Sequence, residues 1–357
     1  MVRAFIPGGA EKMVLCWIQY LSQHYVEEVT CSLLIMQPSK SSLAGLLPPT
    51  QVHYFNVWSW KALGSLFALR KWCRKNSPDI IHAHLPFSGI ISVLLSFFGV
   101  SAIRIYTEHS FIKRNKFSFW LHGFFYSNHH VVHCISKALE NSIVILRGTF
   151  WYFNKNMVTL YSGIPELPMQ ERSSTQKTFV IGTACIFRKD KQLPEMVQLM
   201  SVLALHFVER IDFCIIGDGP ERPELEDALE KTGLKSRVYL PGLVQDLPEY
   251  LKRLDFFMMT SRSEGLPLAL LEAMQQGCIP VVTSVGGINE VLVPEVGIFF
   301  EMEKPEKLIA FLEGIMAMEQ DQLSDLRQKT RQIVLDHFSL EKQIPKLLDL
   351  YHQTLSR

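Results

Sequence analysis

Two glutamates flank a predicted helix start in the second half of the chain. The segment from Glu264 to Glu272 reads Glu-Gly-Leu-Pro-Leu-Ala-Leu-Leu-Glu and follows an apolar run at 255–259 that is short enough for a buried parallel strand. The amides of Gly265 and Leu266 lie where the helix begins, and unpaired N–H groups at such a place attract anions. Two carboxylates cannot both face a bound phosphate without repulsion, so at least one should accept hydrogen bonds from neutral sugar hydroxyls. The segment therefore predicts a sugar-nucleotide site.

A second interpretation of these glutamates stays open. Glu264 can be a solvated loop residue and Glu272 an ordinary surface position of an amphipathic helix, because short motifs often match by chance. The helix itself is well marked, since Pro267 suits a first helical position and Gly277 suits the residue just after the last turn. Residues elsewhere in the chain have to decide between the two interpretations.

Length, charge and cysteine usage limit the class of protein. A chain of 357 residues fits two domains better than one core. Its 36 Lys and Arg balance 35 Asp and Glu, so a nucleic-acid partner has no electrostatic support. The seven cysteines are scattered and show no C-x-x-C spacing, which predicts reduced thiols in a cytoplasmic protein without a disulfide framework or structural zinc.

Short β-rich runs alternate with helical patterns through most of the chain. This alternation predicts an α/β protein whose parallel sheets are covered by helices on both faces. We expect two doubly wound, Rossmann-like domains at 1–166 and 167–338, joined by the polar stretch at 165–177. The apolar stripe within 339–357 predicts a terminal helix that packs back across the domain junction. A ligand cleft is expected between the domains, at the carboxyl ends of both sheets.

Two apolar stretches, one in the first half of the chain and one at the amino terminus, resemble membrane or export segments only in part. Phe87 to Ile103 carries no charge, but it is at the short limit for a membrane span, and Gly99 divides it into a predicted buried helix and a buried strand. At the amino terminus there is no long apolar core of a signal peptide. Arg3 interrupts the first strand expected at 2–6, so either that strand is short or the chain begins further upstream.

Seven short motifs occur in a fixed order along the chain. They are Gly8-Gly-Ala-Glu-Lys12, Asp79-Ile-Ile-His-Ala-His84, Thr107-Glu-His109, Ile181-Gly-Thr183 with Lys191 downstream, Gly217-Asp-Gly-Pro220, Ser263-Glu-Gly-Leu-Pro267 through Glu272, and Gly286-Gly287 with Glu290. Together they resemble the retaining GT-B glycosyltransferases of family four, also called glycosyltransferases group 1, over essentially the full length. The resemblance implies transfer of a hexosyl group from a nucleotide-diphosphate sugar, UDP-linked by the family's habit, to a hydroxyl with retention.

The resemblance also implies roles for individual residues. The catalytic residues would be Glu264, His109 and Lys191, and the donor-binding residues Gly8, Gly9, Arg188, Gly217, Gly265, Leu266 and Glu272. Lys191 would contact the diphosphate, Glu264 the donor sugar, and Glu272 the ribose hydroxyls. No D-x-D follows a predicted strand, so cations and helix starts are expected to take the place of a metal, with the nucleotide sugar as substrate and no cofactor.

Some of these residues also allow a purely structural interpretation, without a role in binding or catalysis. Lys191 lies in the run Arg188-Lys-Asp-Lys, where it can be a solvated charge. His109 at a strand end can be a satisfied structural residue. Gly8 and Gly9 can form a plain tight turn. His82 and His84 have metal-like spacing, but no Cys or carboxylate accompanies them, which disfavours zinc.

One departure from the family pattern concerns the loop before Lys191. The family usually has glycine and arginine there, whereas this chain has Cys185 and Ile186. Arg188 can supply the missing charge only if the loop follows a different path. Losing one charge-assisted contact costs about 1.5 to 3 kcal/mol. This departure motivates an alternative function, a catalytically silent GT-B relative that serves as a binding or partner subunit. A nucleotide-sugar epimerase is disfavoured by the arrangement of Glu264 and Glu272.

The stretch from Phe111 to Trp120 interleaves three cations with aromatic side chains. The resemblance implies that the acceptor-binding domain rests as a peripheral protein on the cytoplasmic face of a membrane, where basic and aromatic residues fit. The opposing interpretation is a loop and helix whose aromatic side chains pack inward. The implied acceptor is a glycan or lipid-linked sugar in the synthesis of a cell-surface polysaccharide or glycolipid, and the sequence identifies neither the sugar nor the base.

Overall fold

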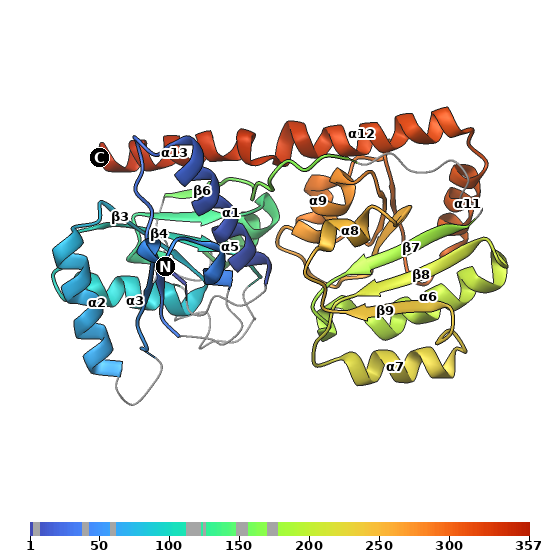
Figure 1. Cartoon of the computed structure of the whole chain (residues 1–357), viewed down its shortest axis with the longest axis horizontal. Helices are drawn as coiled ribbons and strands as arrows, with labels where there is room; N and C mark the ends of the chain where they lie inside the picture. The colour runs from blue at the N-terminus through green and yellow to red at the C-terminus, as the bar shows by residue number, and fades with distance from the viewer. Residues whose placement is uncertain are drawn as a thin grey trace. The chain divides into compact units, whose positions relative to one another are not determined.

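A computed structural model describes residues 1–2, 8–37, 43–57, 62–111, 123, 126–147, 156–169 and 178–357. The chain divides into two compact units, one formed by Met1–Pro165 with Leu340–Arg357 and the other by Glu166–Ser339. Each unit is built on parallel strands with helices around them (Figure 1). The predicted fold class, an α/β protein with two Rossmann-like domains, is confirmed.

The second unit contains one sheet of six parallel strands in the order β12-β11-β10-β7-β8-β9. The strands are β7 (Phe179–Ala184), β8 (Ile211–Ile216), β9 (Val238–Gly242), β10 (Phe256–Met259), β11 (Ile279–Val282) and β12 (Ile298–Phe299). Counted along the chain, this is the order 6-5-4-1-2-3 of Rossmann folds, which reverses direction between β7 and β10. Ligands bind to such sheets beyond the carboxyl ends of the strands at the point of reversal.

Helices cover this sheet on both faces. They are α6 (Leu193–His206), α7 (Arg222–Lys231), α8 (Leu247–Leu251), α9 (Leu268–Gln275), α10 (Ile288–Val291), α11 (Pro305–Met316), α12 (Gln320–Phe338) and the short 3-10 turn η3 (Lys189–Lys191). In Figure 1, α6 and α7 lie on one side of the strands and α8 and α9 on the other. Because β10 and β11 are therefore buried on both faces, each is an unbroken apolar run in the sequence.

The first unit contains a four-stranded parallel sheet in the order β3-β4-β5-β6 and a separate parallel pair, β1-β2. The strands are β1 (Leu33–Ile35), β2 (Val52–Tyr54), β3 (Ile80–His84), β4 (Ile103–Glu108), β5 (Val131–Cys134) and β6 (Met157–Thr159). Met1 and Val2 connect the two groups, since the amide of Val2 donates to Leu34 O (3.0 Å) and the amide of His84 donates to Met1 O (3.0 Å). The remainder of the expected first strand, including Arg3, lies outside the described residues.

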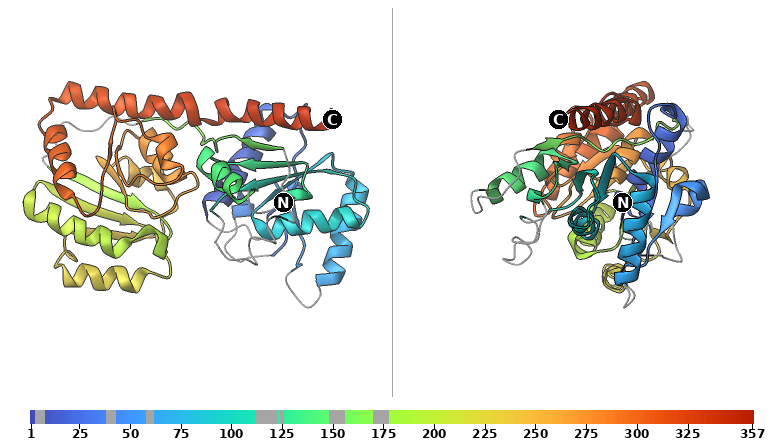
Figure 2. Two further views of the ribbon diagram at one scale, coloured as in Figure 1. Left: turned by 180° about the vertical axis from the view of Figure 1, so that it is seen from behind. Right: turned by 90° about the vertical axis from the view of Figure 1, so that its left-hand side faces the viewer.

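The described helices of the first unit are α1 (Gly9–His24), α2 (Ala62–Asn76), α3 (Pro86–Phe97), α5 (Lys137–Arg147) and α13 (Leu340–Leu355), together with the 3-10 turns η1 (Leu43–Leu46) and η2 (Pro49–Gln51). Figure 2 shows α13 (red) beside α1 (dark blue). The apolar stripe of α13, Ile344, Leu347 and Leu348, is buried. The hydroxyl of Ser339, the residue before this helix, donates to Leu335 O (2.8 Å) in α12.

The uncharged stretch from Phe87 to Ile103 folds as most of α3, then a turn through Gly99 at φ 75°, and then the start of β4. This is the helix and strand that the sequence predicts. In the part of the chain that the structure describes, no helix is long and apolar enough to cross a membrane.

Candidate active site

Two loops meet at the carboxyl edge of the second sheet, where the strand order reverses. The first follows β7 and contains Lys191, and the second follows β10 and contains Glu264. They are hydrogen-bonded to each other, because the hydroxyl of Thr260 donates to Lys191 O (2.9 Å) and the amide of Arg262 donates to Asp190 O (2.8 Å). The sheet topology therefore brings together residues that are more than seventy positions apart in the chain.

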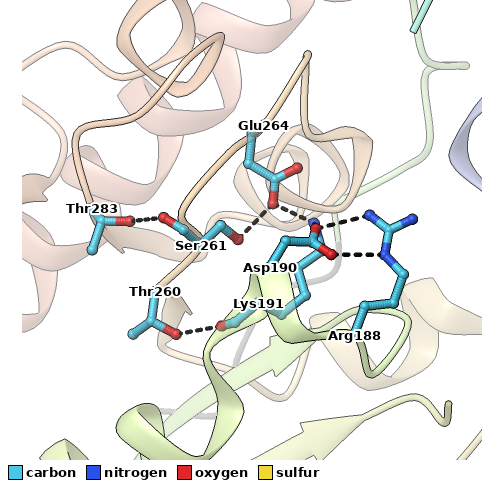
Figure 3. Close-up of polar contacts among 7 residues, drawn as sticks. All are labelled: Arg188, Asp190, Lys191, Thr260, Ser261, Glu264 and Thr283. Carbon is cyan, nitrogen blue, oxygen red and sulfur yellow. Dashed lines mark hydrogen bonds and ion pairs between the residues drawn. The ribbon is translucent and has the colours of Figure 1, made fainter. Parts of the chain in front are cut away.

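Lys191 and Glu264 form the centre of this site (Figure 3). The Nζ atom of Lys191 lies 2.5 Å from Oε1 of Glu264, and the two side chains are only 12% and 10% exposed. The hydroxyl of Ser261 donates to the same carboxylate oxygen at 2.6 Å. Ser261 is held in turn by Thr283, whose hydroxyl donates to Ser261 O (2.9 Å). Lys191 is therefore a largely buried, paired cation and not the solvated charge that its position in a charged run also allowed.

A second ion pair lies on the same turn as Lys191. The guanidinium of Arg188 donates two hydrogen bonds to Asp190, 3.0 Å to Oδ1 and 2.9 Å to Oδ2. Partial burial works against ionisation of Asp190, but the hydrogen bonds from Arg188 and the charge of Lys191, 3.6 Å away, together lower its pKa. The fork-to-fork geometry holds the Arg188 charge beside Lys191, while Ile186 is an uncharged side chain that is 39% exposed.

Glu264 and Glu272 are both about nine-tenths buried, so neither is the surface residue of the second interpretation above. Glu272 lies in α9, which begins at Leu268, with Pro267 preceding the first turn instead of starting it. Gly277 follows the helix at φ 74°, as predicted. Among the described residues, the amides of Gly265 and Leu266 donate no backbone hydrogen bond, so both remain available to an anion.

Two glycines fix the loops of the site by close approach. A Cβ atom on Gly217, which has φ 133°, would lie 1.9 Å from Cys185 O. A Cβ atom on Gly287 would lie 1.9 Å from Gly265 O, and the amide of Gly287 donates to Glu264 O (3.0 Å). Gly217 thus supports the loop before Lys191, and Gly287 supports the loop that carries Glu264.

The remaining predicted site residues belong to the first unit. Gly8 precedes the first turn of α1, and a Cβ atom on Gly9 would meet nothing within 4 Å. His109 follows β4, and its Nε2 lies 3.2 Å from Nδ1 of His84. Burial, with a smaller contribution from His133, lowers the pKa of His109 to about 3, so its ring is neutral. The predicted site residues therefore form two groups, one in each unit.

Sequence reasoning missed Asp190 and Ser261 as parts of the site, and it named Gly287 only within a motif, without a role. The hydroxyl residues after the strand at 256–259 were a usable signal, because polar side chains at the carboxyl end of a buried strand face the ligand edge. Within the described ranges, no three His, Cys, Asp or Glu side chains are grouped so that they could hold a metal ion.

Comparisons with known proteins agree with this architecture. The family model described as Glycosyltransferase Family 4 matches residues 7–164, and the model described as Glycosyl transferases group 1 matches residues 166–333. The UDP-Gal:alpha-D-GlcNAc-diphosphoundecaprenol alpha-1,3-galactosyltransferase of Escherichia coli is 25% identical over 326 residues, which cover 83% of this chain and 81% of that protein.

Solved structures share the fold at low sequence identity. HepE from Anabaena, in complex with UDP, superposes with a TM-score of 0.79 at 15% identity, over 99% of both chains. Sucrose-phosphate synthase from Thermosynechococcus elongatus gives 0.81 at 16% identity, over 99% of this chain and 96% of that one. Two family models that together span nearly the whole chain, and a shared two-domain fold, lead to one conclusion: this protein belongs to the GT-B glycosyltransferases of group 1.

Proposed function

We propose that this glycosyltransferase moves a hexosyl group from a UDP-sugar to a hydroxyl of a glycan or lipid-linked acceptor, with retention of configuration and without a metal ion. The observation that carries the proposal is the buried pair of Lys191 and Glu264 at the point where the strand order reverses. Beside it are the amides of Gly265 and Leu266. Cations and free amides at one edge suit a leaving diphosphate, on which negative charge grows during transfer.

Each group in the site has a distinct task in this scheme. Lys191 and the two amides neutralise the departing diphosphate, as an oxyanion hole neutralises an oxyanion. Glu264 orients the Lys191 ammonium and accepts a hydrogen bond from a hydroxyl of the donor sugar, so that the negative charge of Glu264 is not directed at the phosphates. Glu272 accepts hydrogen bonds from the ribose. In the first unit, His109 contacts the donor sugar, and Gly8 and Gly9 leave the start of α1 open to the diphosphate.

Charge balance explains why donor binding should reorganise the ion pairs. Lys191 is paired with Glu264, and Arg188 is paired with Asp190. A diphosphate brings additional negative charge, which competes with both carboxylates for the two cations. Arg188 is the more exposed cation, so it can turn from Asp190 toward the phosphates and replace the arginine that Ile186 does not provide.

The nature of donor and acceptor is proposed from the relatives. The HepE structure contains UDP, and the name of the Escherichia coli relative includes a UDP-sugar donor and a diphosphoundecaprenol acceptor. We propose the same classes for this chain, in polysaccharide or glycolipid synthesis. None of the seven cysteines, all of which lie within the described residues, is paired in a disulfide, which fits work in the cytoplasm, at the cytoplasmic face of a membrane.

A surface of the first unit suits contact with anionic lipid. The basic and aromatic stretch at 112–120 lies outside the described residues, but α2 and α3 are described. Leu63 and Phe67 on α2 are 73% and 59% exposed, and Phe97 on α3 is 68% exposed. The rings of Phe67 and Phe98 are 6.2 Å apart, so the two helices expose one apolar surface. The same helix α2 carries four cations and no acidic residue: Arg70, Lys71, Arg74 and Lys75.

We expect this α2–α3 surface to bind membranes that contain anionic lipid. The protein should float with vesicles that contain phosphatidylglycerol and much less with neutral vesicles, since each cation contributes about 1 kcal/mol at an anionic surface. Phe67→Ser should weaken binding, whereas Leu205→Ser should not, although Leu205, on α6 of the second unit, is an even more exposed apolar residue (80%). Equal binding of the Phe67 variant and the wild type would contradict a role for this surface.

The donor proposal is tested by a thermal-shift panel of nucleoside diphosphates and nucleotide sugars. UDP should raise the melting temperature more than GDP or ADP, because a ligand at 100 times its Kd adds about 2.7 kcal/mol to the free energy of unfolding. Transfer to a lipid-linked acceptor is then measured with the best UDP-sugar. UDP binding without turnover would favour a catalytically silent subunit. A larger shift with GDP than with UDP would mean that the donor is a GDP-sugar and not a UDP-sugar.

A further inference from the structure

The end of β4 contains a buried carboxyl group to which the proposed function assigns no role. Glu108, the last residue of β4, is only 2% exposed. Its Oε2 accepts hydrogen bonds from the hydroxyls of Tyr126 (2.5 Å) and Tyr106 (3.2 Å). Burial, reinforced by the charge of Glu108, raises the pKa of both tyrosines well above the usual value. They therefore stay protonated and keep donating to this carboxyl group.

The other oxygen of Glu108 holds the main chain that follows β4. Oε1 accepts the amide hydrogens of His109 (3.1 Å) and Ser110 (3.3 Å). A carboxyl oxygen that binds two successive amides fixes the direction in which the chain leaves the strand. The two tyrosines thus hold Glu108, and Glu108 holds the backbone of His109.

The ring of His109 is held from a different element, β3. Its Nε2 lies 3.2 Å from Nδ1 of His84, which is itself buried. Burial, together with neighbouring histidines, lowers the pKa of both rings, so both are neutral and share one proton across this contact. A neutral imidazole has one donor nitrogen and one acceptor nitrogen. The tautomer of His84 therefore decides whether Nδ1 of His109 donates or accepts.

We propose that Glu108 and His84 are positioning residues for His109. Glu108 fixes its main chain, and His84 fixes the tautomer of its ring. Because Nε2 is occupied by His84, Nδ1 is the ring nitrogen that remains for a sugar hydroxyl, and a fixed tautomer gives that hydroxyl a fixed role as donor or acceptor. The inference rests on the proposed function only in assigning His109 to the donor sugar.

The ring tautomer can be measured without any turnover. The 15N shifts of the His109 ring, identified by their loss in His109→Gln, should show one neutral tautomer in the wild type. His84→Leu should give a mixture of both tautomers. His84→Asn should restore a single form, since its side-chain amide reaches about the position of Nδ1 and can hydrogen-bond there. Unchanged shifts in His84→Leu would overturn the role of His84.

Kinetics test Glu108 in the full-length protein. Glu108→Ala should lower kcat by about 100-fold, the cost of a misplaced group, with little change in the KM of the donor. Glu108→Gln should stay close to the wild type, because its amide oxygen still accepts both backbone amides. Combined with His109→Ala, Glu108→Ala should cause no further loss, because it acts through His109.

A matched control is Glu140→Ala, which removes another carboxyl group of the first unit, one that accepts a hydrogen bond from Thr159. It should leave kcat unchanged. Additive losses in the double variant, or an equal loss in Glu140→Ala, would overturn the positioning role of Glu108. If the wild type transfers no sugar at all, the proposed function fails, while the 15N shifts still decide whether His84 fixes His109.

Discussion

Replacing Lys191 by alanine should lower the rate of glycosyl transfer by about 10²- to 10³-fold, the usual cost of removing one group that stabilises developing negative charge. The Lys191 ammonium is the cation nearest to Glu264, at 2.5 Å, and it is also 3.6 Å from Asp190. Without it, a bound diphosphate would lie beside two carboxylates, and Arg188 would be the remaining cation of the two ion pairs. Both kcat and the affinity for UDP should therefore fall in steady-state kinetics and calorimetric titration.

Two further variants separate charge from structure. Lys189→Ala is the matched control, because Lys189 lies in the same 3-10 turn and its side chain is exposed. It should keep the wild-type rate. Glu264→Gln removes a negative charge near the phosphates, so it should bind UDP at least as tightly as the wild type while transferring sugar slowly. A wild-type rate in Lys191→Ala would show that the leaving group is stabilised elsewhere.

The first unit should lose stability steeply as the pH falls below 6.5. His84 and His133 are buried there, with His82 and His109 half-buried in the same cluster, and His82 contacts Tyr351 (2.7 Å) and Thr107 (2.6 Å). Burial lowers the pKa of His109 to about 3 and that of His133 to about 4. It lowers the pKa of His82 and His84 well below the usual value as well.

The sign of the effect follows from proton counts. Between roughly pH 4 and 6.5, the unfolded chain protonates these rings, whereas the folded unit keeps them neutral. The unfolded state therefore binds more protons, and the free energy of unfolding rises with pH across this range. Each ring that stays neutral contributes up to about 1.4 kcal/mol per pH unit, so the slope for the four rings is at most about 5.6 kcal/mol per pH unit, which is steep beside the total stability of a typical domain, about 5 to 15 kcal/mol. Above about pH 7 the effect is absent.

Scanning calorimetry from about pH 7.5 to 5.5 measures this slope. His133→Gln should reduce the slope of the unfolding free energy against pH by the contribution of about one proton. His352→Gln should not, because His352 is exposed on α13 of the same unit. A melting temperature of the first unit that does not change between these pH values would contradict a cluster of histidines that stay neutral in the folded state.

The fold was predictable because its signal is local. Strands buried on both faces must be apolar throughout, so β10 was visible in the sequence as an unbroken apolar run, and the prediction at 255–259 differs from the structure by one residue. The helix after it was visible through Gly277, which needs a positive φ. The same reasoning placed Glu264 in the loop after that strand, whereas Lys191 was singled out only through the resemblance to the family, and Glu108 only as part of a motif, with no task.

The partners within the site were not predictable from local signals. Ser261 and Thr283 are polar residues in loops, and nothing in their neighbourhood shows that one holds Glu264 and the other holds Ser261. Asp190 in the sequence is one charge in a mixed run, but in the structure it accepts both hydrogen bonds of Arg188. The importance of Gly287 depends on the carbonyl of Gly265, twenty-two residues earlier, which a side chain would strike.

The sequence alone determined the alternation of strands and helices, the class of fold and which residues stand at strand ends, because periodicity and apolar runs are properties of neighbouring residues. Tertiary structure alone decided that Lys191 pairs with Glu264 and that His84 meets His109. Parallel strands that are neighbours in a sheet need not be neighbours in the chain, so the side chains that their carboxyl ends bring into contact are set by strand order.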